Sequence, residues 1–363
     1  MSEKPEAAAD WLAALDGLRG VSILLVLTAH IYTAGWPRLG GGFGVTVFFV
    51  LSGFLITRLL LRERRSTGSV DLRAFYVRRA FRLFPIYYLV LAVYCLLLLV
   101  LRLREDLRPA FLGALPWYAF YLQEIPFFRG HGDPLPFYQS WSLGIEEKFY
   151  FVWPFLAFGW QAGAGTRVVL AAMSVVAFSA APSFTAAGRY VFPYAAISAG
   201  CLLALLYDRP GIRARLEAAL GSWRAWIAVA LLVAVHIVAV VGPEAVARAA
   251  ELFYPVAVAM VLVGSLSSPS LGAALSIRPL TFLGRLSYGV YLIHLLIRNA
   301  VESVLRRADD HAIAHSGLTV YLLMLSLSVV AAWFLNARVE TPLRLLGRNL
   351  ARKRERGTAR IAG

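Results

Sequence analysis

The stretch Leu15–Tyr32 combines an apolar run with three side chains that can carry charge: Asp16, Arg19 and His30. An α-helix turns by about 100° and rises about 1.5 Å per residue, so Arg19 and His30, eleven positions apart, share one face about 16 Å apart. An imidazole at that depth could act as a general base towards a hydroxyl group. Asp16 is a further candidate for substrate contact. The alternative is a histidine that only hydrogen-bonds a neighbouring helix.

The motif RRAFRLFP supplies a second group of candidates, the arginines Arg78, Arg79 and Arg82. Arg79 and Arg82 are three positions apart and therefore lie on one helical face, directly before an apolar span. Guanidinium groups in this position suit a phosphate or pyrophosphate ligand. The same arginines could equally be ordinary charges that flank a membrane span.

Two adjacent carboxylates, Glu146 and Glu147, begin the span that contains WSLGIEEKFY. Neighbouring side chains on a helix point about 100° apart, so at most one of them can face the space around His30. A carboxylate there would fix the tautomer of the imidazole. We expect the other carboxylate to pair with Lys148 or with an arginine of an outer segment.

Further polar residues are candidates for positioning a substrate or an oxyanion. Tyr288, Tyr291 and His294 recur every third residue in LSYGVYLIH, where they could donate hydrogen bonds or simply form a polar seam between helices. The backbone near Gly41–Gly44 is an alternative oxyanion donor, although these glycines could equally form a plain loop. Glu340 closes the last span, where pairing with a basic residue is as consistent with the sequence as a functional role.

The other histidines offer less chemistry. His236 lies alone in an apolar span and is expected to be a satisfied core residue, whereas His131, His311 and His315 lie in predicted loops. Neither an HxxxxD nor an HExxH motif is present, and we expect no metal site. Ser52 lies outside any GxSxG motif and is therefore not predicted as a nucleophile.

Composition indicates which elements must position these residues. Of the 363 residues, 59% are hydrophobic and 16% are charged, which predicts an all-α, polytopic membrane bundle of about ten transmembrane helices. The net charge of +15 comes from arginines between apolar spans, so membrane topology and anionic ligands explain it better than nucleic acid. The predicted spans lie near residues 16–34, 44–62, 83–101, 142–160, 167–181, 191–207, 223–241, 251–268, 281–300 and 318–336.

The basic segments predict the sidedness of the bundle. Arginines crowd residues 62–82 and the tail after residue 337, which places both, with the N-terminus, in the cytoplasm. The aromatic segment 102–141 is then an outer, interfacial element. We therefore expect a cytoplasmic tail at 1–14, one transmembrane domain at 15–342 and a basic cytoplasmic tail at 343–363, in a multi-pass protein of the cell membrane. We expect neither a cleaved signal peptide nor a disulfide between Cys95 and Cys201.

Six motifs in order resemble the integral-membrane acyltransferase-3 family: LDGLRG with Arg-x10-His, FFVLSGFLIT, RRAFRLFP, WSLGIEEKFYFVWP, LSYGVYLIH and RVETP. The resemblance implies a ten-helix bundle that takes acyl-CoA from the cytoplasm, with roles for Arg19 and His30 and with Arg79 and Arg82 at the CoA phosphates. It also makes Glu146, rather than Glu147, the family's glutamate.

This chain departs modestly from the pattern of the family. Lys148 stands where glutamine is usual, and Gly144 replaces a commoner serine. Many members also carry an eleventh span and a C-terminal hydrolase-like domain, and we expect neither here.

These observations together predict an O-acyltransferase that depends on acyl-CoA, with His30 as general base and with Glu146 and Arg19 beside it. Acyl-CoA, with acetyl as the default group, is a co-substrate, and no permanently bound cofactor is expected. The predicted acceptor is a hydroxyl of a carbohydrate, or alternatively of a secondary metabolite such as a macrolide. Transfer could be direct or proceed through an acyl-histidine. A transporter or flippase is the alternative of another class, although no paired halves are visible, and a non-catalytic scaffold leaves the shared face of Arg19 and His30 unexplained.

Overall fold

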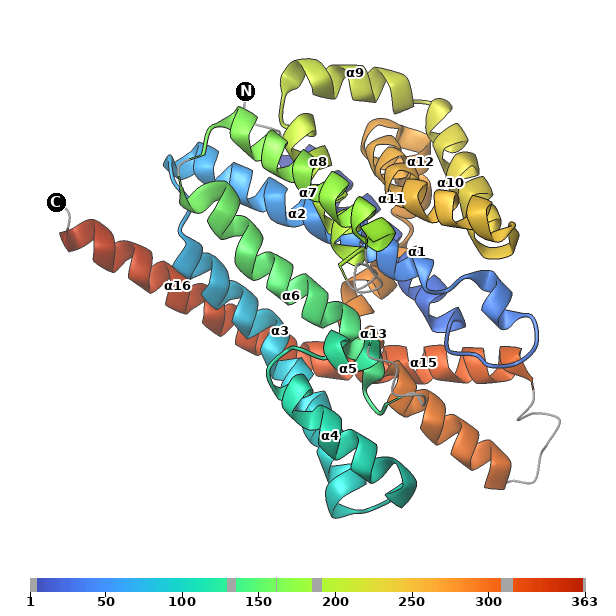
Figure 1. Cartoon of the computed structure of the whole chain (residues 1–363). Helices are drawn as coiled ribbons and strands as arrows, with labels where there is room; N and C mark the ends of the chain where they lie inside the picture. Colours follow the sequence, from blue (N-terminus) through green and yellow to red (C-terminus); the bar gives the residue numbers. More distant parts are fainter. Residues whose placement is uncertain (1–4, 129–134, 161, 185–190, 308–315, 362–363) are drawn as a thin grey trace.

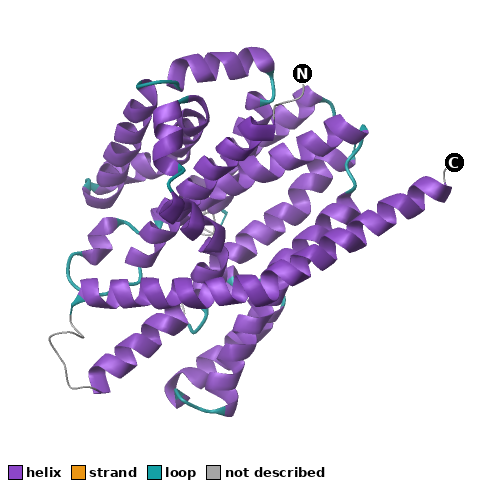
Figure 2. Ribbon diagram, turned by 180° about the vertical axis from the view of Figure 1, so that it is seen from behind, coloured by secondary structure: helices purple, strands orange, loops and turns teal. Residues whose placement is uncertain are grey.

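The structure is a computed structural model that describes residues 5–128, 135–160, 162–184, 191–307 and 316–361. Within these residues the chain forms helices and no strand, as Figure 2 shows from behind. The predicted all-α fold class is confirmed. Helices pack side by side in a single bundle, and the C-terminal end of α16 projects beyond it (Figure 1).

A helix lies at each of the ten predicted spans. They are α1 (Pro5–Thr28), α2 (Phe43–Thr67), α3 (Leu72–Cys95), α6 (Trp141–Pro154), α7 (Ala164–Phe184), α8 (Pro193–Tyr207), α10 (Arg224–Val241), α11 (Glu244–Ser267), α13 (Arg278–Arg307) and α15 (Gly317–Leu335). Three of them continue as π-helical turns: α3 into Leu96–Val100, α6 into Phe155–Gly159 and α15 into Asn336–Glu340.

Seven of these helices in the described chain are long and apolar enough to cross a membrane: α2, α3, α7, α10, α11, α13 and α15. Helix α8 is apolar but shorter, at 15 residues. The structure is therefore that of a helical membrane bundle, while the total of ten crossings stays a prediction.

Glycines let the helices nearest the site approach each other backbone to backbone. A Cβ atom on Gly284 of α13 would overlap the carbonyl of Asp16, and one on Gly20 would overlap the carbonyl of Leu280, so α1 and α13 can pack this closely only through glycine. Gly53 of α2 meets the carbonyl of Ile197 on α8 in the same way. Gly53 thus lets α2 and α8 pack closely.

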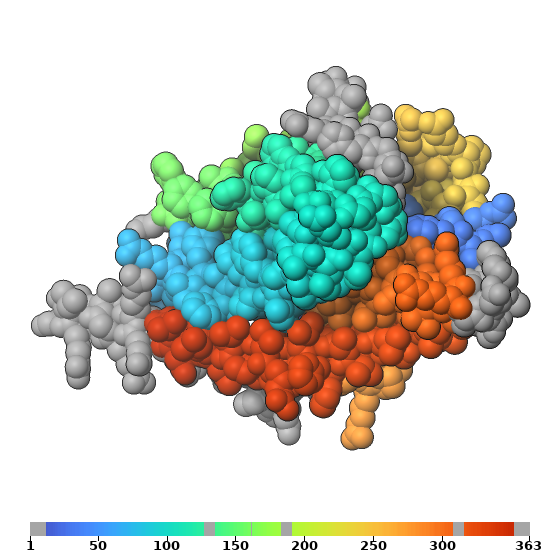
Figure 3. Space-filling view, turned by 90° about the horizontal axis from the view of Figure 1, so that it is seen from below, coloured from blue at the N-terminus to red at the C-terminus, as the bar shows by residue number. Residues whose placement is uncertain are grey.

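Shorter helices cover the ends of the bundle. The predicted interfacial segment forms α4 (Arg108–Ala119) and α5 (Glu124–Phe128), and it stands out over α3 in Figure 3. Connecting segments form α9 (Pro210–Leu220) and α12 (Pro269–Leu275). The predicted basic tail is itself helical, because α16 (Thr341–Ile361) continues α15 after a π-helical turn and packs along α3.

Candidate active site

The helix that carries Arg19 ends earlier than its apolar sequence predicts. Helix α1 stops at Thr28, and residues 29–31 continue as tight turns in which each backbone N–H donates to the carbonyl three residues before. His30 therefore lies just beyond the helix, and its predicted place within a continuous span is wrong. The chain then turns at Gly35, whose φ of +89° is accessible to glycine at little cost.

The imidazole of His30 is hydrogen-bonded to a tyrosine hydroxyl. Its Nδ1 lies 2.9 Å from the hydroxyl of Tyr138, and that hydroxyl lies 3.1 Å from the hydroxyl of Tyr32. Tyr32 is 57% exposed, and the guanidinium of Arg298 stacks over its ring at 4.2 Å. A hydrogen-bonded chain thus leads from His30 to the surface, while Nε2 of His30 has no hydrogen bond among the described residues.

A second histidine, His294 of α13, lies against His30 with the ring centroids 4.8 Å apart. His294 is fully buried, and its Nδ1 donates to the carbonyl of Tyr291 at 2.7 Å. In the neutral ring Nε2 is then an acceptor, and it finds no partner within the described part of the chain. His294 therefore joins the predicted site, but as a hydrogen-bond acceptor rather than as an oxyanion donor.

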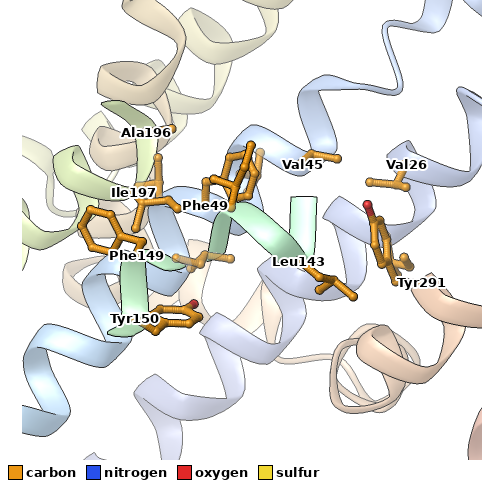
Figure 4. Packing of buried hydrophobic residues seen from close by; sticks show 14 of the residues in the cluster. Val26, Val45, Phe49, Leu143, Phe149, Tyr150, Ala196, Ile197 and Tyr291 are labelled. Carbon is orange, nitrogen blue, oxygen red and sulfur yellow. The ribbon is translucent and has the colours of Figure 1, made fainter. Parts of the chain in front are cut away.

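A cavity of about 110 Å³ lies between α1, α2, α3, α6 and α13. Four guanidinium groups line it, from Arg19, Arg79, Arg82 and Arg285. Its apolar wall includes Val45 and Phe49 of α2 and Leu143 of α6, which Figure 4 shows in the same region as Tyr150 and Tyr291. The combination of clustered cations and an apolar wall suits a ligand that has an anionic end and an apolar chain.

The carboxylates Glu146 and Glu147 separate as expected, but their partners differ from those predicted. Glu147 accepts a hydrogen bond from Arg79 at 3.1 Å, so pairing with Lys148 or an outer arginine is wrong for this residue. Lys148 instead pairs with Glu124 at 2.8 Å. Glu146 accepts from the hydroxyl of Ser52 at 2.9 Å and lines the arginine cavity, which places it with the arginines rather than in hydrogen-bond contact with the imidazole.

The three arginines of the RRAFR motif have different environments. Arg79 is fixed twice, by Glu147 and by the ring of Tyr150, which lies 3.3 Å from its guanidinium carbon. Arg78 pairs with Glu63 at 3.0 Å and is not part of the cavity lining. Arg82 lines the cavity with an exposed side chain.

Arg19 and Glu340 line the same cavity, whereas Asp16 lies beside Arg19 and outside the lining. Arg19 lies 3.7 Å from Asp16, one turn away on α1. Glu340 is buried, lines the cavity and accepts a hydrogen bond from the side chain of Asn336 at 3.1 Å.

The glycine segment Gly41–Gly44 packs against α1, because Gly41 lies against the backbone of Ala29 and Gly44 against the backbone of Ser22. Close helix packing is thus its structural role.

Tyr288 and Tyr291 form the polar seam between helices that their spacing allows. Tyr288 donates to the carbonyl of Leu83 at 2.7 Å, and Tyr291 donates to the carbonyl of Gln139. Since each phenol has a single proton, Ser142 donates to the oxygen of Tyr291 at 2.7 Å. Neither phenolic proton is left for an oxyanion in this arrangement.

The sequence missed three residues of this site. Tyr138 begins a short 3₁₀ helix (Tyr138–Ser140), where no periodicity marks it as a partner of His30. Arg285 lies three positions before Tyr288 and extends the seam of Tyr288 and Tyr291, so the spacing alone could have identified it. Ser52 is not predicted to take part in the site, whereas its hydroxyl donates to Glu146.

The other histidines and the cysteines divide between described and undescribed parts of the chain. His236 is confirmed as a satisfied residue, because Nδ1 bonds the hydroxyl of Tyr254 and Nε2 bonds the carbonyl of Leu39, each at 3.0 Å. His131, His311 and His315 lie outside the described residues. Both cysteines are free thiols.

Comparison with known proteins gives a consistent set of relatives. A family model described as an acyltransferase domain matches residues 12–337. The chain is 32% identical over 310 residues to the putative peptidoglycan O-acetyltransferase YrhL of Bacillus subtilis. This alignment covers 78% of this chain and 48% of that protein. It is 27% identical over 362 residues to the peptidoglycan O-acetyltransferase OatA of Listeria monocytogenes, over 93% of this chain and 56% of that protein. The chain thus spans about half the length of these relatives. No solved structure matches it.

Proposed function

Because this chain belongs to the acyltransferase-3 family, we propose that it transfers an acetyl group from acyl-CoA to a hydroxyl group of a carbohydrate. The observation that carries the proposal is the position of Tyr291. Its side chain lines the arginine cavity, and its carbonyl accepts the hydrogen bond that fixes His294 beside His30. One residue therefore connects a cavity suited to an anionic donor with a histidine pair suited to a hydroxyl acceptor.

His30 is the proposed general base. When Nδ1 donates to Tyr138 and Tyr138 donates to Tyr32, Nε2 keeps its lone pair and can take the proton of an acceptor hydroxyl. The deprotonated oxygen then attacks the thioester carbon, the C–S bond breaks, and the thiolate of CoA leaves. The tyrosine hydroxyls take over the tautomer-fixing role that a carboxylate would otherwise have.

The donor lies in the arginine cavity, with its phosphate groups at the guanidinium groups and its pantetheine arm along the apolar wall. The proposal puts this cavity on the cytoplasmic side, since Arg79 and Arg82 follow the basic segment 62–82. It puts the exposed Tyr32 towards the opposite side. Exclusion of water between the two ends would favour transfer over hydrolysis of the thioester.

The names of the relatives favour a cell-wall glycan as acceptor. Both the Bacillus and the Listeria proteins are named for O-acetylation of peptidoglycan. We extend this to the present chain as the acceptor class, a polysaccharide hydroxyl presented at the membrane surface.

The test is acetyl transfer by the purified protein in liposomes that contain a soluble glycan acceptor and radiolabelled acetyl-CoA. The wild type should release CoA only when the acceptor is present, and His30→Ala should lower the transfer rate at least about 100-fold. Size-exclusion chromatography in detergent checks that the variant is folded. Undiminished transfer by a folded His30→Ala protein would exclude the base role, and lack of transfer from acetyl-CoA by the wild type would exclude the donor.

A further inference from the structure

We propose that Arg82 and Arg285 together bind the phosphate groups of the donor. Arg79, in contrast, has a structural role through its contacts with Glu147 and Tyr150. This inference rests on the proposed function, because it takes acyl-CoA to be the donor. It differs from the expectation raised by the RRAFR motif, which pairs Arg79 with Arg82 as phosphate ligands.

Arg79 is already committed to protein partners. Both Nε and one terminal nitrogen of its guanidinium lie within 3.3 Å of Glu147, and its planar face lies 3.3 Å from the centre of the Tyr150 ring. The Arg79 and Glu147 side chains are 19% and 16% exposed. A phosphate could engage this guanidinium fully only by displacing a carboxylate that is mostly buried, which is costly.

The guanidinium N–H groups of Arg82 and Arg285 are not engaged by protein partners in the described part of the chain. Within the described residues neither side chain makes an ion pair or a hydrogen bond, and both are exposed although they line the cavity. Each planar guanidinium can offer two parallel N–H groups to one phosphate. The cavity therefore presents two unused bidentate donors.

The two arginines come from different helices that are tied together beside them. Tyr288, one turn after Arg285 on α13, donates to the carbonyl of Leu83, the residue after Arg82 on α3, at 2.7 Å. This bond fixes the spacing of the two helices at the level of the two guanidinium groups. A pair held on two tied helices is preorganised for a ligand that bridges them, and preorganisation lowers the entropic cost of binding.

The nearby carboxylates do not occupy these two arginines. Glu146 is bonded by Ser52 and Glu340 by Asn336, and both line the cavity. Asp16 attracts Arg82 and Arg285 but lies in ion-pair distance of Arg19. A ligand with several negative charges at one end would therefore find its strongest contacts at Arg82 and Arg285. The nucleotide end of CoA, with a diphosphate and a 3′-phosphate, has that chemistry, whereas pantetheine does not.

The experiment compares three donors of decreasing phosphate content: acetyl-CoA, 3′-dephospho-acetyl-CoA, which lacks only the 3′-phosphate, and acetyl-pantetheine, which lacks the adenosine as well as all phosphate groups. We expect Arg285→Gln and Arg82→Gln each to lower kcat/KM for acetyl-CoA about 10- to 100-fold, through KM, as for loss of a charged hydrogen bond. Both should leave kcat/KM for acetyl-pantetheine within about twofold of the wild type. Arg278→Gln is the matched control, because Arg278 is exposed on the same helix but outside the cavity lining, and it should behave as the wild type.

A second measurement covers donors that react too slowly. Inhibition by adenosine 3′,5′-bisphosphate, which carries the 3′-phosphate and one of the two 5′ phosphates of CoA, should be competitive with acetyl-CoA in the wild type and at least about tenfold weaker in Arg285→Gln. An unchanged inhibition constant, or an equal loss with acetyl-CoA and acetyl-pantetheine, would overturn the assignment of Arg82 and Arg285. If instead the wild type uses no acetyl-CoA at all, it is the proposed function that fails.

Discussion

The hydroxyl of Tyr138 lies 2.9 Å from Nδ1 of His30, in the place where a catalytic histidine commonly has a carboxylate. A tyrosine in this position is neutral, so it orients the imidazole without adding a negative charge near the acceptor. The same hydroxyl is also hydrogen-bonded to the hydroxyl of Tyr32, at 3.1 Å. The tautomer of His30 thus depends on a chain of two phenols that ends at the surface.

Tyr138→Phe removes the partner of Nδ1 while it keeps the aromatic ring. We expect kcat to fall about 10- to 100-fold with little change in the KM for acetyl-CoA, because the donor lies in the arginine cavity and only the orientation of the base is lost. Steady-state acetyl transfer at varied donor concentration is the measurement. Tyr32→Phe is the control: Tyr138 still bonds His30, so a smaller loss is expected. A Tyr138→Phe protein with wild-type kcat would contradict the positioning role.

The residues with regular spacing were the ones that sequence could place. Arg79 and Arg82 lie three positions apart on α3 and Arg19 lies on α1, and all three line one cavity. Sequence could not place Tyr138, which contacts His30 across 108 positions from a three-residue 3₁₀ helix. Sequence also could not predict which charged residues form ion pairs where several lie close together. Glu147 pairs with Arg79 on α3 rather than with the neighbouring Lys148.

The end of α1 shows a second limit of prediction from sequence. Residues 29–34 are mostly apolar or small, so hydropathy extends the span to residue 34, whereas the helix stops at Thr28. Backbone packing of Gly41 and Gly44 against α1 requires the chain to turn back early. That contact is between segments, and no local pattern in Leu15–Tyr32 encodes it.

His294→Phe tests the unpartnered nitrogen next to His30. Phenylalanine keeps an aromatic ring in the same packing but has no acceptor at the position of Nε2. If an acceptor hydroxyl supplies the missing hydrogen bond, the KM for the glycan should rise about 2- to 10-fold while the KM for acetyl-CoA stays constant. Separate titration of the two substrates distinguishes these effects. A change confined to the donor KM would exclude the contact with the acceptor.

Glu147→Gln tests the structural role of Arg79. The substitution leaves a mostly buried guanidinium without its carboxylate, and we expect it to destabilise the protein by about 1–3 kcal/mol. The measurement is thermal unfolding of the detergent-solubilised protein. Glu244→Gln is the control, since its pair with Arg248 is 80% and 74% exposed and contributes little. Equal melting temperatures for the two variants would mean that the Arg79–Glu147 pair does not stabilise the fold.

Gly284→Ala tests the backbone contact that sets Arg19 and Arg285 around one cavity. The added Cβ would overlap the carbonyl of Asp16, which belongs to the backbone and cannot rotate away, so α1 and α13 must separate. Overpacking of this kind costs about 1–3 kcal/mol, and we expect a lower melting temperature together with a higher KM for acetyl-CoA. Gly42→Ala is the control, because a Cβ there meets no atom within 4 Å. A Gly284→Ala protein with the stability and KM of Gly42→Ala would show that the two helices do not need this contact.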